Sequence, residues 1–397
     1  MIKVYISNAQ HPEFGDVMVP LPIPSNEYES ILDLLKAMEF GDAVQQDCHV
    51  EKMTGSFSIL NRLQGSQVNL YELDYLAKRL DSFDAREKME FKAAAVRLGV
   101  AHIQDFINLT FCCQQATVVT DFSDLESIGK RHYLTIHGGS APVDEFEKVD
   151  GQRVALDLIQ NHDGHITPYG VVYDNGMKLE QVYDGRHFPA YLYEDTLLEL
   201  RVTSKHPDPD QSAADYLYLP APDSLIRRTF LRSGHDLDDI QFHVESHMLP
   251  QTVADVLDVA GEDIWDLNDM CRAIRDLDSG EMDKLSAAVL LAKPESAFEV
   301  GELAKNLELF DFVPGVRDAE DYGKYMIQQS GRFEYDPNLD NFYNYSQYGW
   351  ERINRELGQF SELGYISYQG TMTMEELLCG DPVERIDQQT DGMGGMA

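Results

Sequence analysis

The segment DLNDMCRAIRDLDSGEMDKLSAAVLLAK, residues 266–293, decides how this chain is organised. It parallels YELDYLAKRLDSFDAREKMEFKAAAVRLG at residues 71–99, so the chain contains one block twice. In both blocks apolar residues recur three and four positions apart, which is the spacing of a buried helix face. We therefore predict that both blocks fold into helices on a shared scaffold.

Four further pairs of blocks recur in the same order around this one. His49 and His243 lie 194 residues apart, and so do Gly129 and Gly323. The whole series, with spacings of about 194 to 200 residues, indicates a tandem duplication. The further pairs are 1–25 with 197–224, 47–51 with 241–245, 121–130 with 316–324, and 164–170 with 364–370.

Each copy is expected to be α+β, because strands and a helix precede a helical block and a final helix with strands. The order is not that of a repeated βαβ unit. The first copy is expected to span residues 1–195 and the second 196–380, followed by a flexible tail at 381–397. The expected domains are 1–68, 69–134 and 135–195 in the first copy, and 196–250, 251–330 and 331–380 in the second.

Turn and cap residues place the elements of the first copy. Ser25 and Ser123 are expected to start helices. Asn175-Gly176 and Asp184-Gly185 are typical of hairpin turns, so strands are predicted between them. The expected strands are 2–7, 16–23, 47–53 and parts of 165–193, and a short helix is expected at 153–160.

Charge and composition exclude several classes of protein. The net charge is −37, from 69 acids against 32 bases, which disfavours direct binding to nucleic acid or to an anionic membrane. No apolar run approaches the roughly 18 residues of a membrane span, and no leader peptide is expected. Five cysteines without a CxxC pair are typical of reduced thiols, which favours a cytoplasmic protein.

Motifs for catalysis, cofactors or metals were sought and not found. The sequence has no GxGxxG or GxxxxGK[ST] loop, no HExxH and no GxSxG elbow. His243 and His247 would share one face of a strand and could together bind a metal. The first copy has Met53 near the position of His247, so the histidine pair is not a feature of both copies. Cys112-Cys113 is expected to be core. We therefore expect no catalytic residues, no cofactor and no metal, with an uncharacterised hydrolase as a minor alternative.

The most acidic segment is residues 235–284, which overlaps the duplicated helical block. Between Asp236 and Asp283 there are 14 acids and two bases, a net charge of −12 over 48 residues. On a helical wheel, four of these acids fall opposite the apolar face. Carboxylates held close together on a folded surface repel one another, which destabilises the folded state. Their presence therefore requires a functional reason. The four acids are Glu262, Asp266, Asp269 and Asp276.

Three interpretations of the acids compete on charge alone. They can serve solubility, form a docking module for a basic partner, or imitate the phosphates of DNA. Since DNA carries one charge per about 1.7 Å of its axis, 37 charges match roughly 63 Å of duplex. The net charge is therefore large enough for DNA mimicry, but it does not distinguish mimicry from the other two interpretations.

At its C-terminal side the second copy resembles the ArdA antirestriction family. The resemblance rests on DAEDYGKYMIQQSG (318–331), YNYSQYGWERI (343–353) and GYIS (364–367), and covers the second copy nearly end to end. It implies small three-domain units that are acidic and elongated and imitate bent B-DNA. It also implies that the chain blocks type I restriction-modification enzymes, or a related DNA-binding defence complex of the host, by occupying their DNA groove.

The resemblance also implies which residues bind the partner. Gln328 and Gln329 stand where the family tends to have acids, and Lys130 and Arg131 adjoin the first copy's acids. The expected phosphate-mimicking residues are Asp236, Asp238, Asp239, Asp255, Asp258, Glu262, Asp266, Asp269, Asp276, Asp278, Glu281, Asp283, Asp318, Glu320 and Asp321, with Asp121, Asp124 and Glu126 in the first copy.

The two copies are unequal in charge. Residues 1–195 carry a net −14 and residues 196–397 a net −23, while 42–89, the counterpart of the most acidic segment, carries only −2. The first copy is therefore expected to contribute less to mimicry. Because family members are dimers, the fused copies are expected to form a pseudo-dimer within one chain, and further homodimerisation remains open.

Overall fold

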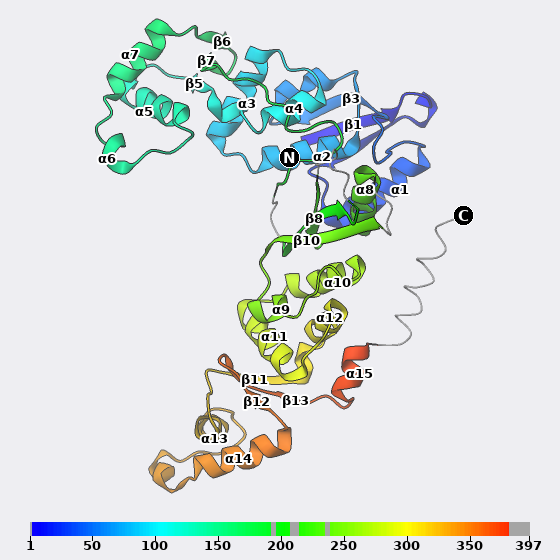
Figure 1. Ribbon diagram of the computed structural model, residues 1–397, viewed down its shortest axis with the longest axis vertical. Helices are drawn as coiled ribbons and strands as arrows, with labels where there is room; N and C mark the ends of the chain where they lie inside the picture. Colours follow the sequence, from blue (N-terminus) through cyan, green and yellow to red (C-terminus); the bar gives the residue numbers. More distant parts are fainter. Residues whose placement is uncertain (1, 192–195, 207–213, 235–238, 381–397) are drawn as a thin grey trace. The chain divides into compact units, whose positions relative to one another are not determined.

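The computed structural model describes residues 2–191, 196–206, 214–234 and 239–380 (Figure 1). The fold is α+β, as predicted, with four small antiparallel sheets interspersed with helices. The chain forms two compact units. The first unit takes 1–193, 204–216 and 222–240, and the second takes 194–203, 217–221 and 241–397. Residues 222–240 thus join the first unit, although the repeat places them in the second copy.

The first copy begins with a sheet of order β2-β1-β3-β4, in which β1 pairs antiparallel with β2 and β3. Alternate residues of β1 are buried, and they join the helices that follow in one continuous core. The elements of this copy are β1 (Ile2–Asn8), β2 (Asp16–Leu21), α1 (Tyr28–Ala37), β3 (Cys48–Gly55), β4 (Gln67–Val68), α2 (Leu70–Asp81), α3 (Ala85–Leu98), α4 (Ile103–Leu109), β5 (Thr117–Val119), α5 (Leu125–Ile136), α6 (Val143–Phe146), α7 (Gly151–Asn161), β6 (His165–Thr167) and β7 (Gly170–Tyr173). Short 3-10 helices lie at Pro12–Phe14, Ser25–Glu27, Ser58–Leu63 and Cys113–Gln115.

The expected strands after residue 173 are wrong. Residues 174–191 form no strand, although Asn175 and Gly176 have the positive φ angles of a turn. Side chains hold this segment instead, because Asn108 accepts a hydrogen bond from the Tyr183 amide at 2.7 Å and donates to its carbonyl. Asp184 likewise accepts from the backbone amides of Arg186 and His187. With these groups satisfied, a strand partner is not needed.

The second copy repeats most of the order of elements in the first, although none of its described strands corresponds to β4 and no described helix of the first copy corresponds to α15. Its sheets have the orders β10-β8-β9 and β11-β13-β12, and the second of these matches β5-β7-β6 strand for strand. Its elements are β8 (Leu198–Ser204), β9 (Asp215–Leu219), α8 (Asp223–Ser233), β10 (Ile240–His247), α9 (Gln251–Ala254), α10 (Ile264–Arg275), α11 (Ser279–Ala292), α12 (Ala297–Lys305), β11 (Phe310–Pro314), α13 (Ala319–Gln328), α14 (Tyr345–Glu356), β12 (Gln359–Phe360), β13 (Gly364–Tyr368) and α15 (Met374–Cys379). Short 3-10 helices lie at Leu307–Leu309 and Pro337–Phe342.

From α2 onward the helices of the two copies start 194 residues apart. Asp84 caps α3 and Asp278 caps α11, each in a capping box with the glutamate three residues later. The same offset relates β7 to the start of β13, so the predicted pairing of 164–170 with 364–370 is wrong. The counterpart of GYISYQG is GVVYDNG at 170–176. The expected helical block 69–134 also contains a strand, β5.

Glycines bring α5 and α7 of the first copy, and α13 and α14 of the second, into backbone contact. A Cβ atom added to Gly129 of α5 would lie 1.8 Å from the Gly151 carbonyl oxygen of α7. A Cβ atom on Gly323 of α13 would lie 2.0 Å from the Tyr345 carbonyl oxygen of α14. Both positions therefore require glycine for the helices to pack at this distance. Among the described residues, no helix is both long and apolar enough to cross a membrane.

Candidate functional site

Half of the predicted acids, nine of 18, lie in the helical block of the second copy, which contains α9, α10, α11 and α12. Helix α10 buries Leu267, Met270, Cys271 and Ile274 and packs on α12. The predicted apolar face is therefore correct. Only Asp266 and Asp269 of the four acids assigned to the opposite face lie within the helix, because Glu262 precedes it and Asp276 is its C-terminal cap.

Four carboxylates gather where α10 and α12 begin. Glu262 accepts a hydrogen bond at 3.0 Å from the amide of Ala297, the first residue of α12. Burial raises the pKa of Glu262, and the charges of Asp266, Asp258 and Glu299 raise it further. We call Asp258, Glu262, Asp266 and Glu299 the acidic cluster. The positive ends of the two helix dipoles partly offset the repulsion within it.

Most of the acidic cluster has no internal cation. Across residues 2–191, 196–206, 214–234 and 239–380, no lysine, arginine or histidine forms an ion pair with Asp258, Glu262 or Glu299. Asp258 is exposed, and the other three members are half-buried. Carboxylates without an internal cation can accept hydrogen bonds from the lysines and arginines of another molecule.

Other predicted acids already have basic partners. Arg272 pairs with Asp269 at 3.1 Å, and Arg275 pairs with Asp276 at 3.0 Å. Acids that imitate phosphates should be free of basic partners within the chain, and these two are not. Asp255 accepts from the side chain of Gln251. Asp283 is exposed on α11.

Several predicted acids cap helices. Asp278 and Glu281 form the capping box of α11, and their counterparts Asp84 and Glu87 do the same in the nearly neutral block of the first copy. These carboxylates therefore support a fold that both copies share. Sequence reasoning could have separated them, since a capping box has a recognisable spacing.

The acids of the C-terminal domains lie on other helices. Asp318 caps α13, and Asp321 is exposed in its first turn, while Lys324 pairs with Glu320 at 2.7 Å. Helix α13 packs on α14, whereas α10 packs on α12, so these acids form a separate group (Figure 1). The helix packing therefore does not join these acids to those of the most acidic segment.

In the first copy the corresponding acids have internal partners. Asp121 accepts from the amide and hydroxyl of Ser123, and Asp124 caps α5 through Ser127. Glu126 accepts from the amide of Gln152 and pairs with Lys130 at 2.9 Å.

The remaining predicted residues are Asp236, Asp238 and Asp239. Asp236 and Asp238 fall outside the described residues. Asp239 accepts hydrogen bonds from the Ser204 hydroxyl and, at 2.8 Å, interacts with His206. His243 and His247 do share a strand, β10. Within the described ranges, no three histidine, cysteine or carboxylate side chains form a group suited to a metal.

Two features were missed or only partly predicted. Glu299 belongs to the acidic cluster but lies beyond residue 283, and its signal was its position three residues after Ser296, the N-cap of α12. Cys112 and Cys113 are both buried, as predicted, but they follow α4 and do not lie in it.

The raised pKa of Glu262 gives a testable dependence of stability on pH. The folded chain binds this proton more tightly than the unfolded chain, so the associated stability falls as pH rises through the folded pKa. Glu262→Gln keeps an acceptor for Ala297 and removes this loss. Its free energy of unfolding relative to wild type is therefore expected to be higher at about pH 7 than at about pH 4, measured by urea denaturation.

Asp276→Asn is the matched control with the opposite sign. The hydrogen bond and charge of Arg275 lower the pKa of Asp276, so its stabilising effect is present above the unfolded pKa and is lost in acid. The free energy of unfolding of this variant, relative to that of wild type, should therefore be lower at about pH 7 than at about pH 4. A Glu262→Gln difference that does not change with pH would contradict the assignment.

The sequence matches no known protein-family model, and no curated protein is significantly similar to it.

Proposed function

We propose that this protein is a DNA mimic that inhibits a type I restriction-modification enzyme, or a related DNA-binding defence complex, by occupying its DNA groove. One observation supports this most strongly. The second helical block carries an acidic cluster with few internal cations on the same framework that is almost neutral in the first copy. In the first copy Gln64 and Val68 occupy the positions of Asp258 and Glu262, so these two carboxylates are not a requirement of the fold. Asp266 and Glu299 correspond to Glu72 and Asp105.

The proposed mechanism is competitive and involves no chemical step. Lysines and arginines that line a DNA groove would donate to Asp258, Glu262, Asp266 and Glu299 in place of phosphate oxygens. Exposed carboxylates such as Asp255, Asp283 and Asp321 would add longer-range attraction and speed association. The proposal requires no cofactor and places the protein in the cytoplasm.

The finer architecture belongs to the same proposal. Each copy would be an ArdA-like unit with a sheet-and-helix domain, a helical domain and a small α/β domain, and the fused units would act as a pseudo-dimer. Joining two units in one chain raises the effective concentration of the second once the first is bound. The greater charge of the second copy gives it the larger share of mimicry.

A competition assay tests the proposal directly. A labelled duplex bound to a type I restriction enzyme should be displaced by the full chain, and raising NaCl from about 0.1 M to about 0.5 M should weaken the inhibition by more than about tenfold. The reason is that the Debye length falls from about 10 Å to about 4 Å over this range. Inhibition that persists unchanged at high salt would contradict phosphate mimicry.

The same assay separates the alternative function. An acidic module for some other basic protein would bind without displacing DNA, and fluorescence anisotropy of the duplex would remain high. Displacement of DNA from the enzyme supports mimicry; binding without displacement supports the alternative.

A further inference from the structure

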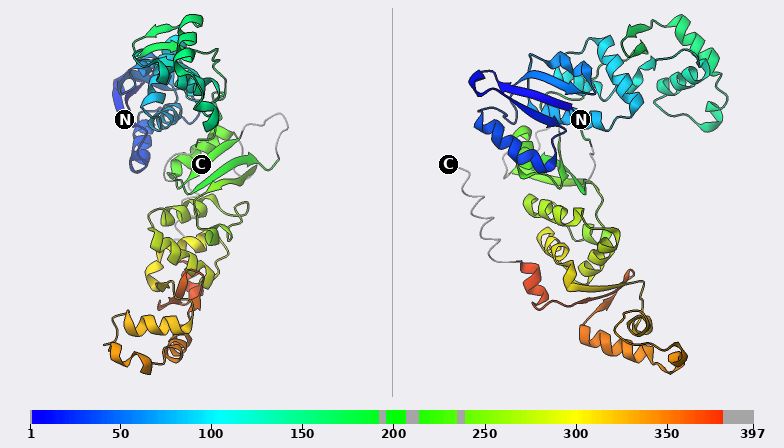
Figure 2. Two further views of the ribbon diagram at one scale, coloured as in Figure 1. Left: turned by 90° about the vertical axis from the view of Figure 1, so that its left-hand side faces the viewer. Right: turned by 180° about the vertical axis from the view of Figure 1, so that it is seen from behind.

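Helix α8 comes from the second copy but packs within the first compact unit. It lies beside α1, as the views of Figure 1 and Figure 2 agree. Three of its residues spaced four apart, Ser224, Arg228 and Arg232, contact the first copy and therefore define one helix face.

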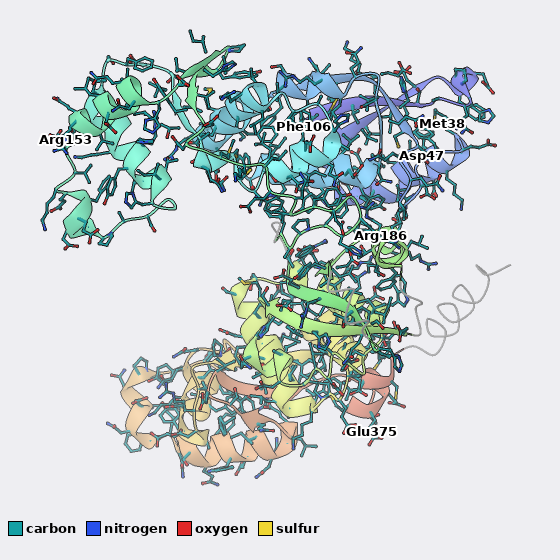
Figure 3. The ribbon with its side chains drawn as sticks, turned by 45° about the horizontal axis from the view of Figure 1, so that its top comes forward. Met38, Asp47, Phe106, Arg153, Arg186 and Glu375 are labelled. Carbon is teal, nitrogen blue, oxygen red and sulfur yellow. The ribbon has the colours of Figure 1, made fainter. Side chains whose placement is uncertain are left out.

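Arg232 is the most buried contact of this face, with only 2% of its surface exposed. Its guanidinium donates to the carbonyl oxygen of Ala43 at 3.0 Å, to that of Arg186 at 2.7 Å and to the hydroxyl of Tyr183 at 2.9 Å. The group also lies over the ring of Phe188, 4.4 Å from its centroid. Arg186, labelled in Figure 3, returns a hydrogen bond to the Arg232 carbonyl.

The Tyr183 hydroxyl links the buried guanidinium to a buried acidic residue. The Tyr183 hydroxyl donates to Glu72 at 3.0 Å, and Glu72 is 1% exposed. Burial and the neighbouring Glu72 raise the pKa of Tyr183, so its hydroxyl remains a donor. An arginine matches this arrangement because its planar fork can reach several acceptors at once, which an ammonium cannot.

The remaining contacts extend the same face. Arg228 donates to the carbonyl oxygen of Gly41 at 2.7 Å and lies over the ring of Tyr71. The amide of Ser224 donates to Glu29 at 3.1 Å. The first copy thus offers carbonyl oxygens, aromatic faces and the carboxylates of Glu29 and Glu72, which suit a basic helix face.

The first copy's own helix α1 lacks these features. Counting from Pro22 and Pro220, Leu34 occupies the position of Arg232, and Ser30 that of Arg228. Leu34 is 45% exposed, so this face of α1 is not buried against an equivalent site. The arginines are therefore specific to α8 and are not part of the repeated scaffold.

We propose that the first copy contains a receptor site for an arginine-bearing helix and that α8 of the second copy is its ligand. Residues 41–43, Glu72, Tyr183 and 185–188 form this site, and Arg232 determines its specificity. The contacts at this site hold α8 on the first copy, in addition to the covalent connection between the two copies. This inference does not depend on the proposed function as a DNA mimic.

Hydrogen exchange on the full chain tests the proposal. Arg232→Ala is expected to speed amide exchange at least about tenfold, both in α8 and in residues 41–47 and 183–188, because the buried acceptors lose their donor. Arg232→Lys should give an intermediate effect and provides the measurement if the alanine variant does not fold. Arg227→Ala, which removes an exposed arginine of the same helix, is the matched control and should change exchange little.

Chemical rescue separates a receptor site from a general loss of helix stability. Guanidinium chloride at tens of millimolar should restore the protection of 41–47 and 183–188 in Arg232→Ala, whereas sodium chloride at equal concentration should not. Unchanged exchange of these receptor residues in both Arg232 variants would overturn the proposal, as would faster exchange confined to α8.

Discussion

Neutralising the acidic cluster is expected to weaken inhibition of a type I restriction enzyme by roughly 30-fold. Four lost ion pairs at about 0.5 kcal/mol each amount to about 2 kcal/mol. The variant combines Asp258→Asn, Glu262→Gln, Asp266→Asn and Glu299→Gln, and inhibition constants are measured by DNA competition at constant salt. The salt dependence of the inhibition should become shallower as well, because fewer charges engage the target.

The matched control removes the same charge from the first copy. Four of its exposed acids, Asp144, Glu145, Glu147 and Asp163, are changed to the corresponding amides. This variant should lose much less inhibition, since the net charge of the two variants is identical and only the position differs. Equal losses in both would show that overall charge, not the cluster, governs binding. Urea denaturation of both variants checks that the fold is retained.

Gly323→Ala is expected to cause the largest loss of stability of any single change considered. The added Cβ would lie 2.0 Å from the carbonyl oxygen and 2.8 Å from the carbonyl carbon of Tyr345. Both atoms are backbone, so relief requires α13 and α14 to separate. The cost is expected to be on the order of 3 kcal/mol in the free energy of unfolding, measured by urea denaturation.

Gly280→Ala is the control for this change. Gly280 also lies in a helix, but the nearest atom to its added Cβ is a carboxylate oxygen of Asp278, at 3.3 Å. The side chain can yield, and alanine favours the helix, so stability should stay equal or rise slightly. If Gly323→Ala is as stable as this control, the close packing of α13 on α14 is not required.

Local signals allowed many elements to be predicted. Apolar spacing located α10 and α11, and the strands expected at 2–7 and 47–53 correspond to β1 and β3. The failures have physical causes. Residues 174–191 contain the turn residues of a hairpin, but Asn108 and Asp184 satisfy their backbone, and no sequence pattern reveals a partner 75 residues away.

The sequence predicted where the acidic residues of the candidate site lie, but not which of them form ion pairs within the chain. Sequence located the most acidic segment, yet Asp269 and Asp276 pair with arginines close to them in the chain. The acidic cluster joins the starts of α10 and α12, which depends on how these helices pack. Glu299 therefore entered the site only through tertiary structure. The placement of α8 in the first unit was likewise invisible, because its sequence position assigns it to the second copy.

The glycine contact between α13 and α14 also affects the entropy of binding. With no side chain between the backbones of Gly323 and Tyr345, the two helices have little room to rotate against one another. Glu320 and Asp321, one turn before the contact, therefore have little backbone motion left to lose when a partner orders them. Carboxylates held in advance in this way bind at a smaller entropic cost than the same charges on a loop.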